Sequence, residues 1–325
     1  MKLAETLRLE PLAGDLARVE ARLGEAVRHQ DQFLGDVASH LVGAGGKRVR
    51  PTLALCAAYA TTDASGPATD AAVTGAVAVE LVHLGSLYHD DVIDEAETRR
   101  GVPSVNARWS NIVAILSGDF LLARASALAA SLGANVAGLL ADTIGELCRG
   151  QVLELQHLFD VERSEEGYSS AIEGKTASLF AAACRIGGMV TGVSEPALDA
   201  LSRFGHHLGM GFQIVDDVLD ITATDDVLGK PAGQDLVEGV YTLPVIYALS
   251  DSTPLRELLA QPLDPDRLAE ARRLATTNGA VDAALGVARD HAAKAGDALS
   301  GAEGLDPEVC DALGRLVGGL VERDS

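Results

Sequence analysis

Residues 80–101, ELVHLGSLYHDDVIDEAETRRG, combine an apolar helical pattern with three aspartates and end in two arginines. Asp90 and Asp94 are four residues apart, so on a helix both carboxylates leave the same face one turn apart. Two bare carboxylates held this close repel each other and need a counter-charge. Mg²⁺ suits this place, because it binds one or two carboxylates together with substrate phosphate oxygens. The alternative interpretation is a solvated acidic face.

A second stretch repeats the arrangement, which favours a metal site over a solvated acidic face. Residues 212–220, FQIVDDVLD, set three aspartates in another apolar run with the same DDxxD spacing. Two such motifs are expected by chance only ~0.02 times in a chain of this length and aspartate content. We therefore expect two helices that form two walls of one metal site. The aspartates concerned are Asp90, Asp91, Asp94, Asp216, Asp217 and Asp220.

The composition limits the class of protein. The chain has 325 residues, enough for one large domain or two small ones, and its low aromatic content of 4% favours packed helices. A net charge of −21 argues against a general nucleic-acid-binding surface. The cysteines lie in apolar segments without CxxC spacing, which predicts reduced core residues of a cytoplasmic protein. They are Cys56, Cys148, Cys184 and Cys310.

No secretory signal or membrane span is expected. The N-terminus, MKLAETLRLEP, carries acidic residues early and lacks an apolar segment of the kind that signal peptides contain. The longest uncharged run, residues 125–141, is rich in small and polar residues and slightly short for a bilayer. We interpret it as a buried core helix of a soluble protein.

Apolar residues at helical spacing predict a single all-α domain over residues 1–325, with no series of strands. The segment 222–239, TATDDVLGKPAGQDLVEG, lacks periodicity and is predicted to be a mobile loop. Because it follows the second aspartate helix, it is also a candidate lid. The predicted helices are two between 12 and 42 with a break near 29–31, then 51–61, 70–96, 109–131, 134–158, 165–190 and 195–222, with further helices over 255–322.

Basic residues occur around both aspartate motifs. Cations interleaved with metal-binding carboxylates indicate polyanionic ligands: metals bridge one diphosphate to the aspartates, and basic side chains hold a second one without metal. Taken singly, each of these cations is more typical of a protein surface. They are Lys47, Arg48 and Arg50 on a glycine-rich turn, Arg99 and Arg100 after the first motif, Lys175 in KTASLF, and Lys230 in the loop.

Together these landmarks resemble those of the trans-isoprenyl diphosphate synthases, or polyprenyl synthetases, in order and spacing. They are GGKRVRP (45–51), ELVHLGSLYHDDVID…RRG (80–101), SGDFLLA (117–123), KTASLF (175–180), FQIVDDVLD (212–220), GK (229–230) and EGVYTLP (238–244). The resemblance implies an all-α bundle of the isoprenoid-synthase type around a deep central cavity, usually as a homodimer. It further implies head-to-tail condensation of isopentenyl diphosphate onto an allylic diphosphate, with about three Mg²⁺ ions per active site.

The resemblance also assigns roles to individual residues. Isopentenyl diphosphate would be bound by Lys47, Arg50, His83 and Arg100. The allylic diphosphate would be bound by Arg99, Lys175, Thr176, Gln213 and Lys230. The main Mg²⁺ ligands would be Asp90, Asp94 and Asp216, supported by Asp91, Asp217 and Asp220. Catalysis would depend on Asp90, Asp94, Lys175, Asp216 and Lys230, and no protein base is evident. One departure is Val240, because relatives usually carry a lysine shortly before TLP.

The residues one turn before Asp90 should decide the length of the product. Short-chain members of the family place an aromatic residue there as a floor, whereas this chain has Gly85 and Ser86. A tunnel that continues past Val82 would admit roughly six to ten isoprene units, because one helical turn of about 5.4 Å matches one unit. A respiratory quinone side chain has this length. Alternatively, Gly85 only allows close helix packing, and a lower floor limits the product to about four units, as in a farnesyl or geranylgeranyl diphosphate synthase.

Two further classes of protein remain open at this point. A class I terpene cyclase also ionises a prenyl diphosphate with Mg²⁺, but it needs no second diphosphate site, and its second metal motif usually mixes Asn, Ser/Thr and Glu. A non-catalytic subunit of a heteromeric prenyl synthase would tend to lose one aspartate motif. The GGKRVRP turn argues against the first alternative, and the two intact motifs argue against the second.

Overall fold

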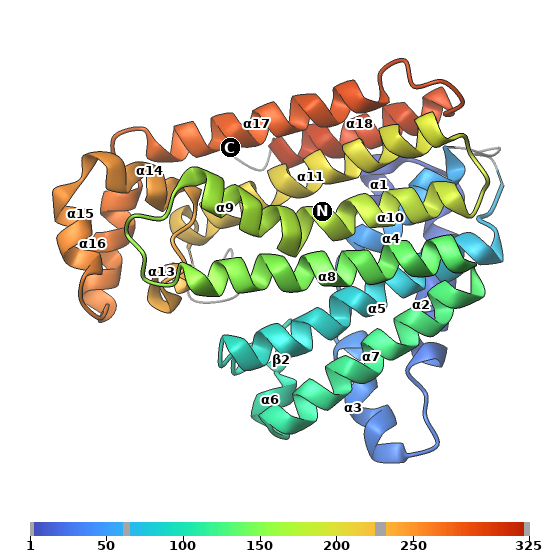
Figure 1. Ribbon diagram of the computed structural model, residues 1–325, viewed down its shortest axis with the longest axis horizontal. Helices are drawn as coiled ribbons and strands as arrows, with labels where there is room; N and C mark the ends of the chain where they lie inside the picture. The colour runs from blue at the N-terminus through green and yellow to red at the C-terminus, as the bar shows by residue number, and fades with distance from the viewer. Residues whose placement is uncertain (1–2, 61–65, 225–231, 322–325) are drawn as a thin grey trace. The chain divides into compact units, whose positions relative to one another are not determined.

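The computed structural model describes residues 3–60, 66–224 and 232–321 (Figure 1). Its described elements are helices apart from two short strands, so the predicted all-α class is confirmed. The elements are α1 (Leu3–Leu7), α2 (Leu12–Ala26), α3 (Gln32–Gly43), α4 (Val49–Tyr59), α5 (Asp70–Ile93), β1 (Thr98–Arg99), β2 (Val102–Pro103), α6 (Val105–Arg108), α7 (Asn111–Ser131), α8 (Ala134–Gln156), α9 (Glu165–Ile172), the π-helix η1 (Glu173–Ala177), α10 (Ser178–Met189), α11 (Glu195–Thr222), α13 (Gln234–Glu238), α14 (Leu243–Asp251), α15 (Thr253–Leu259), α16 (Pro265–Ala275), α17 (Ala280–Leu299) and α18 (Pro307–Val321).

Side-chain caps define where several of these helices begin. Asp31 accepts a hydrogen bond from the backbone N–H of Leu34 and so starts α3, after the break that the sequence predicts. Thr69 caps α5 in the same way, and Ser164, the predicted cap, accepts from the N–H of Gly167 at the start of α9. These ends are set locally, which explains why the sequence predicts them well.

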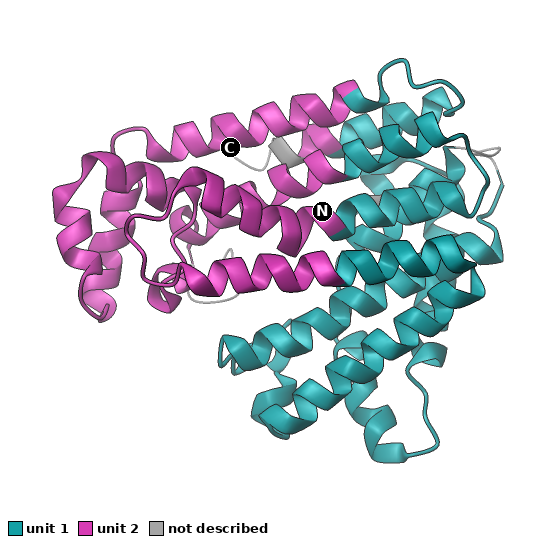
Figure 2. Ribbon diagram, in the orientation of Figure 1, with its two compact units in different colours: residues 1–144, 179–205, 298–316 teal, residues 145–178, 206–297, 317–325 magenta. Residues whose placement is uncertain are grey.

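The chain folds into two compact units, coloured separately in Figure 2. Unit 1 comprises Met1–Ile144, Leu179–Gly205 and Ala298–Leu316. Unit 2 comprises Gly145–Ser178, His206–Asp297 and Val317–Ser325. The first aspartate motif belongs to unit 1 and the second to unit 2, so each is described within its own unit. The single domain over 1–325 and the shared metal site stay predictions.

Unit 1 is built around α5, which packs against α7, α4 and α2. Most of α5 is buried, including every residue from Ala72 to Val82. Burying apolar surface contributes roughly 25 cal/mol per Å², so this helix supplies much of the unit's stability. Its buried body holds its C-terminal turn, and with it the first aspartate motif, in a defined position.

The core of unit 2 joins α14, α15 and α16 to the end of α11, with Tyr241 and Leu255 among its buried residues. The predicted loop 222–239 lies partly outside the described residues. Within its described part, Gln234–Glu238 form the short helix α13, whereas a loop was predicted over the whole segment. The backbone N–H of Gly233 donates to the carbonyl of Asp220, so the chain returns to the end of α11 here.

Two other predictions are wrong. The run 125–141 is not one buried core helix: it comprises the end of α7 and the start of α8, and many of its residues are exposed. All four cysteines are free, and Cys56 and Cys184 are buried as expected, but Cys148 is exposed. Both segments are apolar and helical, as predicted. Their exposure differs from the prediction because the sequence does not show which side of a helix another helix covers.

Candidate active site

The first aspartate motif lies at the C-terminal end of α5, where Asp94 is the C-cap and its N–H donates to the carbonyl of Asp90. The helix dipole places partial negative charge at this end, so carboxylates here are unfavourable without a cation. The second motif lies in the same position, in the last two turns of α11. A local conflict of this kind is typical of a functional site, and a bound metal ion would remove it.

Asp91 differs from its neighbours because it is fully buried, whereas Asp90 and Asp94 are half-buried. Its Oδ1 accepts a hydrogen bond from Arg99 Nε at 2.6 Å, and its Oδ2 has no hydrogen-bond partner among the described residues. Burial raises the pKa of Asp91, and the charge of Arg99 opposes the shift. The contact fits the predicted supporting role of Asp91 and fixes Arg99 beside the motif.

Arg99 and Arg100 lie on a hairpin that the sequence did not predict. Strands β1 and β2 pair antiparallel, with Arg99 opposite Val102, and the connecting residues Arg100 and Gly101 both have positive φ angles. Two consecutive positive φ angles are what a type I′ hairpin turn requires. The turn therefore sends the side chains of the two arginines to different partners.

Arg100 contacts the glycine-rich turn that precedes α4. Its Nη1 donates to the carbonyl of Gly45, and a Cβ atom on Gly46 would lie 2.9 Å from Arg100 Cζ. Gly46 has a φ of 153°, and any side chain at this position would displace the guanidinium. The structure thus brings the GGKRVRP turn and the arginine pair together within unit 1.

Arg50 and His83 lie close enough to Arg100 to interact with it electrostatically. Burial lowers the pKa of Arg50 to about 10, and its Cζ lies 4.8 Å from the centroid of the Phe180 ring. Burial, and then the charges of Arg50 and Arg100, lower the pKa of His83 well below its usual value. His83 is therefore neutral at pH 7. Three of the four predicted isopentenyl diphosphate residues form one basic group, and Lys47 lies exposed on the adjoining turn.

Arg48, the remaining cation of the turn, has a structural role. It is buried and forms ion pairs with Glu20 at 2.5 Å and with Glu80 at 2.9 Å. Its φ of 49° places it in the left-handed region at the start of α4. These contacts hold the turn in shape, so the guanidinium of Arg48 already has its partners inside the protein.

The neutral His83 makes stability depend on pH. As pH falls through 6.5, the unfolded chain takes up a proton at this histidine and the folded chain does not, so the free energy of unfolding falls. The slope from this residue is at most about 1.4 kcal/mol per pH unit. We expect His83→Gln to make the loss of stability between pH 7 and 5.5 shallower in denaturant titrations. His29→Gln, at an exposed position, should keep the wild-type slope, and equal slopes in all three proteins would contradict the prediction.

In unit 2, Lys175 and Thr176 lie on the π-helix η1, between α9 and α10. The sequence predicted one helix over 165–190 and missed this wider turn. The wider turn lies against α8, where a Cβ on Gly150 would lie 2.3 Å from the N atom of Lys175. π-Turns inside α-helices are frequent at functional sites, because the extra residue redirects the side chains.

A chain of hydrogen bonds connects η1 to the second aspartate motif. Thr176 Oγ1 donates to Gln213 Oε1 at 2.7 Å, and Gln213 Nε2 donates to Asp217 Oδ1 at 2.8 Å. The hydroxyl of Tyr168 donates to Asp217 Oδ2 at 2.5 Å. Lys175 Nζ forms an ion pair with Glu154 at 2.5 Å. Thr176, Gln213 and the motif are therefore assembled within unit 2, as the resemblance implies.

Both carboxylate oxygens of Asp217 are used inside the protein, whereas Asp216 is exposed. Burial raises the pKa of Asp217 to about 7, against the hydrogen bonds from Tyr168 and Gln213. Asp220 is buried, and its Oδ2 accepts from the N–H of Asp235. Of these aspartates, the exposed Asp216 is thus the one whose carboxylate a ligand reaches most easily, and its role as a metal ligand stays a prediction. Lys230 lies outside the described residues.

Gly85 meets the backbone of α7. A Cβ on Gly85 would lie 3.1 Å from the carbonyl oxygen of Gly118 and 3.2 Å from the side chain of Leu122. This contact favours the alternative interpretation, in which Gly85 allows close helix packing. Ser86 is half-buried, and its Oγ donates to the carbonyl of His83. A role in product length is therefore more easily tested at Ser86.

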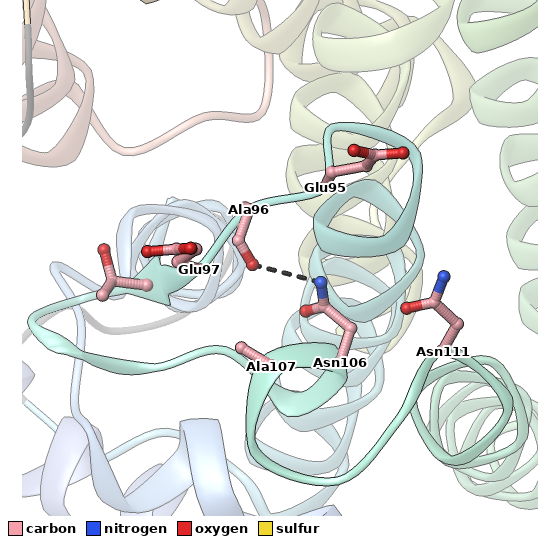
Figure 3. Close-up of a pocket in the computed structure, with 7 residues that line it drawn as sticks. Glu95, Ala96, Glu97, Asn106, Ala107 and Asn111 are labelled. Carbon is pink, nitrogen blue, oxygen red and sulfur yellow. Dashed lines mark hydrogen bonds between the residues drawn. The ribbon is translucent and has the colours of Figure 1, made fainter.

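An open hollow of about 570 Å³ follows the first aspartate motif in unit 1. Figure 3 shows Asn106 donating from Nδ2 to the carbonyl of Ala96 beside it, at 3.1 Å. The lining residues are Glu95, Ala96, Glu97, Thr98, Asn106, Ala107 and Asn111. None of them was predicted as a site residue, and the deep central cavity stays a prediction.

Three polar residues around the second motif, Glu154, Tyr168 and Arg163, were not predicted as site residues. A signal was available for Tyr168, which precedes Lys175 by seven residues and so falls on the same face two helical turns earlier. Glu154 stands alone in the apolar end of α8, where an acid needs a partner. Arg163 lies between helices, and no periodic pattern indicates its burial.

The fold and the two sites define an all-α protein that presents an acidic motif and basic side chains in each unit, as an enzyme acting on two diphosphates requires. The family model of the polyprenyl synthetases matches residues 31–276. The chain belongs to this family and is a prenyltransferase with the all-α isoprenoid synthase fold.

Three similar proteins illustrate the relationship. Nonaprenyl diphosphate synthase of Mycobacterium tuberculosis is 43% identical over 95% of this chain and 92% of its own length. Heptaprenyl diphosphate synthase component 2 of Geobacillus stearothermophilus is 46% identical over 74% of each chain. The solved structure of a polyprenyl synthase from Caulobacter crescentus, complexed with calcium and isoprenyl diphosphate, superposes with a TM-score of 0.91 and 33% identity over 99% of this chain and 98% of that one.

Proposed function

We propose that this enzyme condenses isopentenyl diphosphate head-to-tail with an allylic diphosphate, in the presence of Mg²⁺, to make a long all-trans polyprenyl diphosphate. The observation that carries the proposal is the pair of aspartate motifs, each at the C-terminal end of a helix and each beside basic side chains of its own unit. Two anionic substrates and a metal account for this combination of charges, which a terpene cyclase with one diphosphate does not need.

Asp90, Asp94 and Asp216 would hold the metal, and Asp91, Asp217 and Asp220 would support them. The donor set fits a hard cation, because it consists of carboxylates at helix ends that repel each other without one. Bound Mg²⁺ would act as a Lewis acid on the diphosphate oxygens. The crystal structure of a related polyprenyl synthase is complexed with calcium and isoprenyl diphosphate, which supports a divalent cation in this family.

The residues would divide the work between the two substrates. Arg99, Lys175, Thr176, Gln213 and Lys230 bind the allylic diphosphate and stabilise the negative charge that it gains as its C–O bond breaks. Lys47, Arg50, His83 and Arg100 hold isopentenyl diphosphate, so that its double bond attacks the allylic cation and a C–C bond forms. The proton lost from the new chain passes to the departing diphosphate.

The product is proposed to be long, of about six to ten units, because no aromatic residue precedes the first motif at positions 85 and 86. The names of the nonaprenyl and heptaprenyl synthases support this length. A shorter farnesyl or geranylgeranyl product is the second candidate, with a floor formed by Phe120 or Leu121. Leu116, the third residue considered for this floor, is exposed. One relative is named component 2 of a heptaprenyl diphosphate synthase. A heteromeric assembly is therefore one of the outcomes that the tests distinguish.

We further propose that a second copy of the chain covers α7, which gives a homodimer. By length and composition α5 and α7 are both apolar enough to cross a membrane, but 78% of the apolar window of α5 is buried against only 33% of that of α7. The exposed stripe of α7 includes Ile112, Ile115 and Leu116. An apolar face of this extent is typical of a protein interface, and a second copy that covers it would keep the enzyme soluble. The proposed location is cytoplasmic.

A charge in this stripe should dissociate the dimer. Leu116 is 61% exposed, so Leu116→Asp costs little within one copy but would bury an unpaired carboxylate in the interface. We expect the sedimenting mass to fall from two chains to one. Leu155→Asp, at a comparably exposed site on α8, serves as the control and should remain dimeric. A wild-type chain that sediments as a monomer would contradict the proposed dimer.

The proposed activity is tested by incubating the purified chain with labelled isopentenyl diphosphate, Mg²⁺ and each allylic primer in turn. Elongated products whose dephosphorylated alcohols contain six to ten units are expected. Cyclic products without consumption of isopentenyl diphosphate would identify a terpene cyclase. Activity that appears only after a second protein is added would identify a subunit of a heteromer.

A further inference from the structure

Arg163 is a buried cation of unit 2 that the proposed roles leave unexplained. It lies between α8 and α9 and is 4% exposed. Its Nη1 donates to the carbonyl of Tyr241 at 3.1 Å. Its Nε and Nη2 are enclosed and have no hydrogen-bond partner in the part of the chain that the structure describes.

This arrangement is unfavourable for folding. A buried guanidinium has lost its water, and burial accordingly lowers the pKa of Arg163. Donors that stay unpaired after burial cost free energy, and an apolar side chain of similar size at this position would not carry that cost. Arg163 is therefore not explained by stability. A buried group without a partner in a native protein needs an explanation, and a role in function is one such explanation.

The surroundings of Arg163 indicate what that function is. Its Cζ lies 5.6 Å from the centroid of the Tyr168 ring, and the hydroxyl of Tyr168 donates to Asp217. Glu154, the partner of Lys175, exerts the largest favourable charge effect on Arg163, and Asp217 is also within electrostatic reach. The guanidinium therefore lies beside the ring of Tyr168 and within electrostatic reach of Glu154 and Asp217.

These residues leave unit 2 with excess negative charge where a diphosphate is proposed to bind. Glu154 and Asp216 repel a polyanion, and the ammonium of Lys175 is already shared with Glu154. A positive charge in a region of low dielectric acts over several ångströms without direct contact. Arg163 is buried in such a region. Among the described residues, it forms no ion pair with Glu154 or Asp217.

We propose that Arg163 is a positioning residue for diphosphate binding, whose uncompensated buried charge offsets the repulsion between the acids of unit 2 and the diphosphate. The inference rests on the proposed function and adds a residue to it. The role depends on charge and not on the shape of the guanidinium. A lysine at position 163 should therefore retain it, as should a lysine at position 240, which adjoins the carbonyl that Arg163 contacts.

The test measures binding of inorganic pyrophosphate with Mg²⁺ by calorimetry, together with the melting temperature. We expect Arg163→Met to weaken pyrophosphate binding at least ~10-fold while the melting temperature stays equal or rises. Arg163→Lys should bind within ~3-fold of the wild type, and the double variant Arg163→Met/Val240→Lys should recover most of the affinity. Arg267→Met is the matched control, because Arg267 also has an unpartnered Nε within the described part of unit 2 but hydrogen-bonds to Gln261 and Leu258; it should bind normally.

Two results would overturn the inference alone: unchanged pyrophosphate affinity in Arg163→Met, or a loss of affinity that neither lysine variant restores. The second would show that the residue matters only for local structure. A wild-type chain that does not bind pyrophosphate with Mg²⁺ would instead overturn the proposed function, and this inference with it. In the condensation assay, Arg163→Met should raise the KM for the allylic diphosphate far more than that for isopentenyl diphosphate.

Discussion

Asp216→Ala is expected to lower kcat for condensation by at least about 10³-fold while leaving the fold intact, because a metal ligand contributes several kcal/mol to stabilising the leaving group. Asp216 is exposed, so its removal creates no cavity. Asp90→Ala should have the same effect from the first motif. Product formation is measured with labelled isopentenyl diphosphate, and folding is followed by circular dichroism.

A direct measurement of metal binding distinguishes loss of the metal from other causes of low activity. Both variants should bind fewer Mn²⁺ ions than the wild type in a paramagnetic resonance titration with pyrophosphate. Asp217→Asn, in contrast, should keep the ion count, because both oxygens of Asp217 are engaged by Tyr168 and Gln213. The control Asp282→Ala, an exposed aspartate in the first turn of α17, should behave as the wild type. Near-normal turnover in either alanine variant would end the metal assignment.

The product of Ser86→Phe is expected to be shorter by several isoprene units than that of the wild type. Ser86 precedes Asp90 by four residues, so both side chains leave the same face of α5 one turn apart. A phenyl ring there would stand about 5.4 Å beyond the metal site along the path of the growing chain. Chromatography of the dephosphorylated products measures the length.

Gly85 provides the comparison. An aromatic residue at 85 would also precede the motif by about one turn, but there it would have to separate α5 from the carbonyl of Gly118. We expect even Gly85→Ala to cost about 1–3 kcal/mol of the free energy of unfolding through overpacking. Ser86→Ala, which adds no bulk, should leave the product unchanged. If Ser86→Phe makes wild-type products at a normal rate, the tunnel does not pass this residue.

Local patterns predicted the helices best where their ends are set by neighbouring residues. The predicted helix 195–222 agrees with α11 at both ends, and 109–131 differs from α7 by two residues at its start only. The π-turn at Lys175 and the hairpin at Arg99 were missed. The first lies against Gly150 of another helix, and a contact between distant residues leaves no local pattern. The second consists of strands of two residues each, which are too short for a periodic signal.

For the site, the sequence by itself determined which charges are present and at which helix ends they occur, because motif spacing and helical periodicity are properties of neighbouring residues. The tertiary structure decided which charges are already neutralised: Arg48 by Glu20 and Glu80, Lys175 by Glu154, and Arg99 in part by Asp91. It alone showed that Arg163 is buried without a counter-ion from the residues that the structure describes. The physical reason is that pairing and desolvation depend on residues far apart in the chain, which meet only when the helices pack.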